Sequence, residues 1–247
     1  MDLTWPEVVD ATLKHVEESL TQFRGRIKYW DVINEAHDWA NAFNLTQEQN
    51  VELAVLACAR AREIDPDAKL IVNSSLVFAE YAANHEVSSG PLFDKLKTPL
   101  QYLEDIIEAG ADFDIVGLQL YFPARDLTAI DRLIRVFEKL GKPIHITKLG
   151  VPAGTGRGEE YPMASRDVLP QIGLARGRWR APWSEQVQAD WLERFYVQML
   201  ACESVEAISW WDMQDPGFMK TSPFLLMDGS PRSIFYRLRE IRRAYTR

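Results

Sequence analysis

The sequence predicts an α/β fold of the TIM (β/α)8-barrel type, present as a partial barrel of about five βα units. Short apolar segments rich in β-branched residues alternate with segments of helical spacing, which indicates a parallel sheet. No glycine-rich phosphate loop follows any of these segments, which argues against an open nucleotide-binding sheet. Polar or aromatic residues stand instead where each predicted strand ends, and there a (β/α)8 barrel has its active site.

The periodicity and the capping signals define the individual elements. Thr46 and Gln49 can form a capping box at the start of a helix, and Gly110 and Gly141 stand just past two helix ends. The predicted strands cover residues 27–33, 69–73, 113–120, 143–149 and 206–211. The predicted helices cover residues 5–24, 46–65, 98–109, 126–140, 185–202 and 231–246.

Composition restricts the class of protein. The 247 residues are 47% hydrophobic, and we expect a single domain over residues 1–247. The net charge of −8, without a long basic run, argues against nucleic acid and anionic membranes as partners.

The chain shows neither a signal peptide nor an apolar run near the roughly 20 residues that span a bilayer. Cys58 and Cys202 are too few for a disulfide scaffold, so we expect free thiols.

Glu35 is the first candidate for chemistry, because it is a carboxylate at the end of an apolar strand. Burial beside aromatic rings favours the protonated carboxyl group that a general acid needs. The alternative role is an N-cap or an ion-paired carboxylate at a barrel rim. The aromatic residues near it in sequence are Tyr29, Trp30 and Trp39.

The ends of the last two predicted strands carry a lysine and a pair of tryptophans. Lys148 is either a Schiff-base nucleophile or the charge partner of Glu35, and we favour the partner role. Trp210 and Trp211 suit either stacking on a sugar ring or core packing, and strand alternation predicts that one faces inward.

A metal site is not expected, although His37 and Asp38 follow Glu35 closely. The other histidines are scattered along the chain, and no histidine pair has the spacing of a zinc motif. We expect no cofactor either.

The segment Trp-Asp-Val-Ile-Asn-Glu-Ala over residues 30–36 resembles the fourth-strand motif of glycoside hydrolase family 10, the retaining endo-1,4-β-xylanases on a TIM barrel. In that motif the asparagine contacts the sugar and the glutamate is the acid/base, which implies these roles for Asn34 and Glu35. The segments that resemble the later strands and the closing segment, in family order, are 71–73, 114–119, 145–149, 208–211 with Asp215, 223–228 and 231–236.

The resemblance implies the partner and the location of the protein. Xylan or a xylo-oligosaccharide would be the ligand, and the protein would be extracellular or periplasmic, as family members usually are. The side chains implied to contact the sugar are Asn34, Gln119, Tyr121 and Trp211.

The sequence departs from the family pattern in three places. The family's first three strands have no counterpart, Tyr121 stands where a histidine is expected, and Lys148 stands where the family has its nucleophilic glutamate. Retention needs two carboxyl groups about 5–5.5 Å apart. A lysine cannot form the glycosyl ester, and a nearby ammonium favours an ionised Glu35. The candidate replacement carboxylates are Glu159, Glu160 and Asp212.

Three hypotheses about function follow. The first is an endo-1,4-β-xylanase-type domain with Glu35 as acid/base. The second is a catalytically inactive barrel that binds xylan, with Lys148 and Glu35 as an ion pair. The third is Schiff-base chemistry at Lys148. In each case the open edges of a partial barrel predict self-association.

Overall fold

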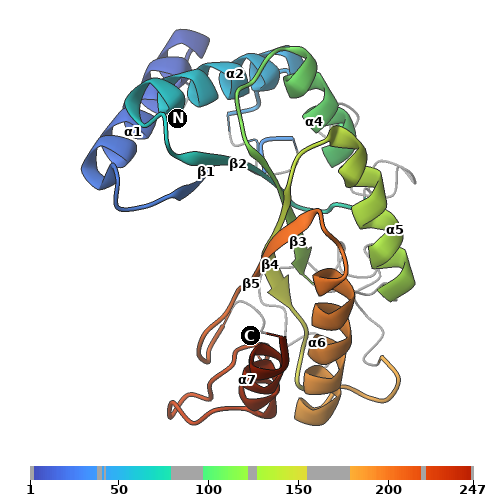
Figure 1. Ribbon diagram of the computed structural model, residues 1–247. Coiled ribbons are helices and arrows are strands. Elements are labelled where there is room, and N and C mark those ends of the chain that lie inside the picture. Colours follow the sequence, from blue (N-terminus) through green and yellow to red (C-terminus); the bar gives the residue numbers. More distant parts are fainter. Residues whose placement is uncertain are drawn as a thin grey trace. The chain divides into compact units, whose positions relative to one another are not determined.

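The computed structural model describes residues 3–37, 41, 43–78, 97–121, 127–154, 179–217 and 221–245 (Figure 1). Within these residues five strands form one sheet in the order β1-β2-β3-β4-β5. β1 pairs parallel with β2, and β2 pairs parallel with β3. The predicted alternating α/β chain with a parallel sheet is therefore confirmed. The strands are β1 (Tyr29–Asn34), β2 (Lys69–Ser74), β3 (Ile115–Tyr121), β4 (Ile144–Gly150) and β5 (Val205–Trp210).

The helices follow the predicted positions within a few residues. Thr46 and Thr98 cap their helices as N-cap residues, each accepting a hydrogen bond from the backbone N–H of the glutamine three residues later. The helices are α1 (Trp5–Phe23), α2 (Gln47–Ile64), α4 (Pro99–Glu108), α5 (Leu127–Phe137), α6 (Glu185–Leu200) and α7 (Ser233–Tyr245).

The predicted helix over residues 126–140 differs in its last turn. The α-helix ends at Phe137, and a 3-10 turn over Glu138–Leu140 follows it. Gly141, at a φ of 70°, then ends the segment in the left-handed region, as its position predicted. The tighter turn satisfies carbonyl groups at the end of the helix.

The chain divides into two compact units. The first comprises residues 1–85, 89–119 and 137–145, and the second comprises 86–88, 120–136 and 146–247. The expectation of a single domain over residues 1–247 stays a prediction.

The first compact unit has its core where helices cover the sheet. Helices α1 and α2 pack side by side (Figure 1). Small residues on α2 let the helix approach its neighbours closely, and the side chains of Ala54, Ala57 and Cys58 are fully buried. The fully buried side chains on the strands of this unit include Leu70, Val72, Val116, Leu118 and Ile144.

The core of the second compact unit lies between α6 and α7, which pack against each other (Figure 1). Trp210, at the end of β5, packs against this core. The buried members are Leu192, Phe224, Ile234 and Ile241.

Strand β1 lies at one edge of the sheet and is less buried than its neighbour. In β2 the five residues after Lys69 are all buried, whereas in β1 only Ile33 is buried. Within the described residues, no helix combines the length and the apolar character that crossing a bilayer requires.

Candidate active site

The carboxyl ends of β1, β2 and β3 bring three amide side chains together, and one of them contacts Glu35. Nε2 of Gln119 donates a hydrogen bond of 2.7 Å to Oε1 of Glu35 and a longer one of 3.5 Å to Oδ1 of Asn34. Nδ2 of Asn73 donates to the same Asn34 oxygen at 2.9 Å. We call Asn34, Glu35, Asn73 and Gln119 the amide–carboxylate cluster.

A register shift between β1 and β2 aligns two members of this cluster. Tyr29, Trp30 and Asp31 pair with successive residues of β2, and the register then shifts between Asp31 and Ile33. The shift places Asn34 opposite Asn73. An irregularity of this kind re-aims the side chains that follow it, which is common beside active sites.

The backbone of Glu35 has a conformation that non-glycine residues rarely adopt. Its φ is 58°, and its N–H donates a 2.9 Å hydrogen bond to the carbonyl oxygen of Asn73. A non-glycine residue in the left-handed region costs about 1–3 kcal/mol and stays there only when its surroundings fix it. The turn therefore presents the carboxylate to Gln119 from a fixed backbone.

Asn73 is a member of the cluster that the sequence did not single out as a site residue. It is only 1% exposed, and Nδ2 also donates to Oδ2 of Asp31 at 3.2 Å. The sequence signal for Asn73 was its position as a polar residue near the end of an otherwise apolar strand. The residues to which it donates hydrogen bonds depend on the strand register, which the sequence does not reveal.

His37 follows Glu35 by two residues and is buried. It is 4% exposed, and its ring stacks on that of Tyr102 from α4, with centroids 5.7 Å apart. Burial, the largest effect, lowers the pKa of His37 to about 4, against smaller opposite effects from the Ser75 backbone and the Glu35 charge. The imidazole is therefore neutral at neutral pH.

The aromatic residues predicted near Glu35 have their ring contacts elsewhere in the first compact unit. Trp30 packs against Phe23 and donates Nε1–H to the carbonyl oxygen of Ile27. Tyr29 packs against His145 at 5.3 Å between ring centroids. Trp39 lies outside the described residues.

Lys148 and Trp211 form a pair in the second compact unit. Nζ of Lys148 lies 4.8 Å from the ring centroid of Trp211, within the range of a cation–π contact. The backbone N–H of Trp211 donates to the carbonyl oxygen of Leu149 at 2.9 Å. This bond holds the backbone of Trp211 beside that of Leu149, the residue that follows Lys148. The predicted ion pair of Lys148 with Glu35 joins two different compact units and stays a prediction.

The two tryptophans at the end of β5 face different surroundings, as strand alternation predicted. Trp210 packs against Phe224 and donates Nε1–H to the carbonyl oxygen of Ser222 at 3.1 Å. Trp211 is 46% exposed. The indole available to a ligand is therefore that of Trp211.

The other predicted site residues are only partly described. Tyr121 ends β3, but its side chain lies outside the described residues, as do Asp38, Glu159 and Glu160. Asp212 packs closely on Gly217, where an added Cβ would be 2.6 Å from Cγ of Asp212.

The described residues hold no group of three histidine, cysteine, aspartate or glutamate side chains that could bind a metal ion. Both cysteines are free thiols. Burial, the largest effect, raises the pKa of Cys58 to about 12, which keeps this thiol protonated and inert.

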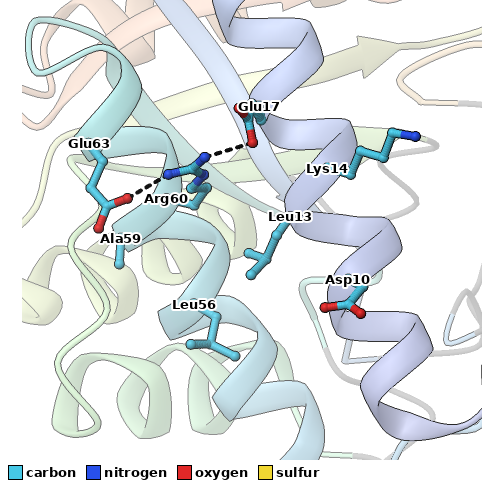
Figure 2. Close-up of a pocket in the computed structure, with 8 residues that line it drawn as sticks. All are labelled: Asp10, Leu13, Lys14, Glu17, Leu56, Ala59, Arg60 and Glu63. Carbon is cyan, nitrogen blue, oxygen red and sulfur yellow. Dashed lines mark hydrogen bonds and ion pairs between the residues drawn. The ribbon is translucent and has the colours of Figure 1, made fainter.

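A separate hollow of about 560 Å³ lies between α1 and α2 (Figure 2). Leu13, Leu56 and Ala59 form its apolar part, and Arg60 bridges Glu17 and Glu63 at its rim. All its lining residues come from the two helices, so it lies apart from the strand ends that carry Glu35.

The carboxylate of Glu35 and the amide that holds it lie at the carboxyl ends of parallel strands, where TIM-barrel enzymes have their active sites. Residues 3–229 match the profile of Glycosyl hydrolase family 10. The chain therefore belongs to this family.

Solved structures show the same fold. Xylanase 10B from Thermotoga maritima matches with a TM-score of 0.65 at 22% identity, over 99% of this chain and 69% of that one. The family 10 structure from Paenibacillus barcinonensis matches with a TM-score of 0.66 at 16% identity, covering 99% and 70%. The predicted fold class, a partial barrel of the TIM type, is thereby confirmed.

Curated relatives are xylanases that are longer than this chain. Endo-1,4-beta-xylanase B of Thermotoga neapolitana is 24% identical over 95% of this chain, which spans 62% of that protein. Endo-1,4-beta-xylanase B of Neocallimastix patriciarum is 28% identical over 58% of this chain, and the aligned part is 16% of that protein.

Proposed function

We propose that this chain is an endo-1,4-β-xylanase-type domain that acts on β-1,4-linked xylan, with Glu35 in the acid/base position. The observation that carries the proposal is the hydrogen bond from Gln119 to Glu35 within the amide–carboxylate cluster. The xylanase relatives support xylan as the ligand, and one matched structure is a xylanase 10B from Thermotoga petrophila in complex with xylobiose.

Three members of the cluster and two aromatic residues have chemical tasks in this proposal. Glu35 gives a proton to the oxygen of the bond that breaks, while the attack on the anomeric carbon needs a second carboxylate, for which Glu159, Glu160 and Asp212 are the candidates. Gln119 holds one carboxyl oxygen, so that the other faces the sugar. Asn34 and Trp211 contact the sugar, through an amide and an indole face respectively. Tyr121 joins them as a sugar contact.

A second candidate function is saccharide binding without hydrolysis, and Lys148 favours it. Retention needs a carboxylate that attacks the anomeric carbon. An ammonium at this position has no lone pair for that attack, and it lies against the Trp211 ring instead. Schiff-base chemistry at Lys148 is a third hypothesis, and borohydride trapping of a carbonyl substrate tests it.

The proposal also concerns location. Xylan is a polymer too large to enter a cell, so a domain that acts on it works outside the cytoplasm. We place the protein in the extracellular or periplasmic space.

Xylotriose separates the two main candidates. We expect calorimetry to detect binding by the unaltered protein, and chromatography to reveal whether xylose and xylobiose appear. Products that vanish in Glu35→Gln support the xylanase-type function. Binding of xylotriose without product, unchanged in Glu35→Gln, supports the binding function. If the protein neither binds nor cleaves xylotriose, both candidate functions are contradicted.

A further inference from the structure

We propose that Asp31 is a positioning residue of this site: its carboxylate fixes the orientation of the side-chain amides of Asn73 and Asn34. The inference rests on the proposed function, because it names a residue that prepares the same site for a saccharide. The observation that carries it is a row of hydrogen bonds with a carboxylate at each end, Asp31 at one end and Glu35 at the other. All members of the row belong to the first compact unit.

The irregularity in β1 brings Asp31 to the same neighbour as Asn34. The two residues are three places apart, so on a regular strand their side chains would face opposite sides of the sheet. The register shift between Asp31 and Ile33 removes this difference. Nδ2 of Asn73 donates to Oδ2 of Asp31 at 3.2 Å and to Oδ1 of Asn34 at 2.9 Å. The NH2 group of one buried asparagine therefore connects the two side chains.

The two carboxylates select one orientation of the amides. An ionised carboxylate accepts hydrogen bonds and donates none, so Asn73 turns its NH2 group to Asp31. For the same reason Gln119 turns its NH2 group to Glu35. Both NH2 groups also reach the same acceptor, Oδ1 of Asn34. A reversed Asn34 would set its own NH2 group against two others.

Asp31 has a larger influence on Asn34 than Glu35 has, because the contact from its end of the row is shorter. The 2.9 Å bond from Asn73 is an ordinary hydrogen bond, whereas the 3.5 Å contact from Gln119 lies beyond the usual range. With Oδ1 of Asn34 turned to Asn73, its NH2 group points away from the row. Asn34 is exposed, so a ligand meets an NH2 group whose orientation is set in advance, which lowers the cost of binding.

Hydrogen exchange of the side-chain NH2 groups tests this orientation in the unaltered protein. NMR resolves these groups, and exchange slows where the hydrogens are held in buried hydrogen bonds. We expect the NH2 group of Asn73, a residue only 1% exposed, to exchange at least about tenfold more slowly than that of Asn34. Equal rates at the two residues, or slower exchange at Asn34, would overturn the proposal.

Asp31→Asn tests the role of the carboxylate. This variant keeps the shape of the side chain and adds a donor, so Asn73 turns its oxygen to position 31. The same oxygen then faces Asn34, whose NH2 group becomes the donor to it. We expect exchange at Asn34 to slow by about three- to tenfold, and xylotriose to bind more weakly by the same factor, the effect of one hydrogen bond.

Asp112→Asn is the matched control. Asp112 is an exposed aspartate of the same compact unit, and it pairs with Arg62 at 2.9 Å. It precedes the start of β3, whereas Gln119 lies near the carboxyl end of that strand. The same loss of charge at Asp112 should leave the exchange pattern and the affinity for xylotriose unchanged. Equal effects of the two substitutions would overturn the proposal.

The two readouts separate this inference from the proposed function. Unchanged exchange and unchanged affinity in Asp31→Asn remove the inference and leave the proposed function intact. The expected exchange pattern and its change in Asp31→Asn, in a protein that does not bind xylotriose, support the positioning role and contradict the proposed function. If Asp31→Asn does not fold, the exchange rates of the unaltered protein decide.

Discussion

His37 connects the turn of Glu35 to the interior of the first compact unit. Glu35 is in the left-handed region, and two residues later the imidazole of His37 is buried against the ring of Tyr102. A buried neutral histidine cannot take up a proton without being hydrated or paired. Protonation of His37 therefore opposes folding, and the stability of this unit depends on pH through His37.

We predict that acid destabilises the protein through His37. The pKa of His37 is about 4 in the folded protein and about 6.5 in the unfolded chain, so the unfolded chain binds more protons between these values. The stability that the neutral imidazole provides is complete above pH 6.5 and is lost as the pH falls from 6.5 to 4. From pH 7 to pH 5 the loss is about 2 kcal/mol.

Urea unfolding of the parent and of His37→Phe at both values of pH measures this effect. Phenylalanine keeps a ring against Tyr102 and does not titrate. We expect the parent to lose about 2 kcal/mol more than the variant between pH 7 and pH 5. Equal losses in the two proteins would show that His37 is not the group responsible.

Arg232 joins three elements of the second compact unit. It pairs with Asp215 at 2.5 Å and with Glu185 at 3.0 Å, and Glu185 also accepts from the backbone N–H of Ser233 at the start of α7. The side chains of Arg232 and Asp215 are 9% and 14% exposed. Loss of the arginine would leave a buried carboxylate without its cation.

We predict that Arg232→Met lowers the free energy of unfolding by about 3–5 kcal/mol. The matched control is Arg237→Met, because Arg237 pairs with Asp190 and Glu193, whose side chains are both 47% exposed. Solvent screens those pairs, so we expect a loss of about 1 kcal/mol or less. Denaturant unfolding compares the two variants, and similar losses would refute the role of burial.

Capping residues and hydrophobic periodicity were enough to predict the elements of this chain. Thr46 with Gln49 and the left-handed glycines Gly110 and Gly141 are local signals, and the structure confirms each of them. The early end of α5 at Phe137 was not predicted, because a last turn of 3-10 type leaves no distinct mark in the periodicity.

The site was predictable only in part. Strand ends identify Asn34, Glu35 and Gln119 as neighbours, since parallel strands end at one edge of the sheet. The contact of Asn34 with Asn73 depends on the register shift in β1, and the left-handed turn at Glu35 depends on its surroundings. Neither has a sequence signature, because both arise from pairing between distant segments.

The edge of the sheet is the feature of the whole molecule most relevant to solution behaviour. β1 is the first strand in the sheet order, and Ile27 and Tyr29 beside that edge are 40% and 46% exposed. An edge strand with exposed apolar side chains is a template for pairing with another chain.

We predict that the protein self-associates through this edge. Light scattering after size exclusion should give a mass that rises with concentration above that of one chain. Tyr29→Lys places a charge on the edge and should shift the mass towards that of one chain. A single-chain mass at all concentrations in the parent would contradict the prediction.

We propose that Glu35 is an intact acid/base group and that Lys148 occupies the position of the nucleophile. The most direct test is the rate of aryl β-xylobioside hydrolysis by the parent, Lys148→Glu and Lys148→Gln. We predict that Lys148→Glu is at least about 100-fold faster than either, because only it restores a carboxylate that can attack the anomeric carbon. A Lys148→Glu protein no faster than Lys148→Gln would contradict the claim.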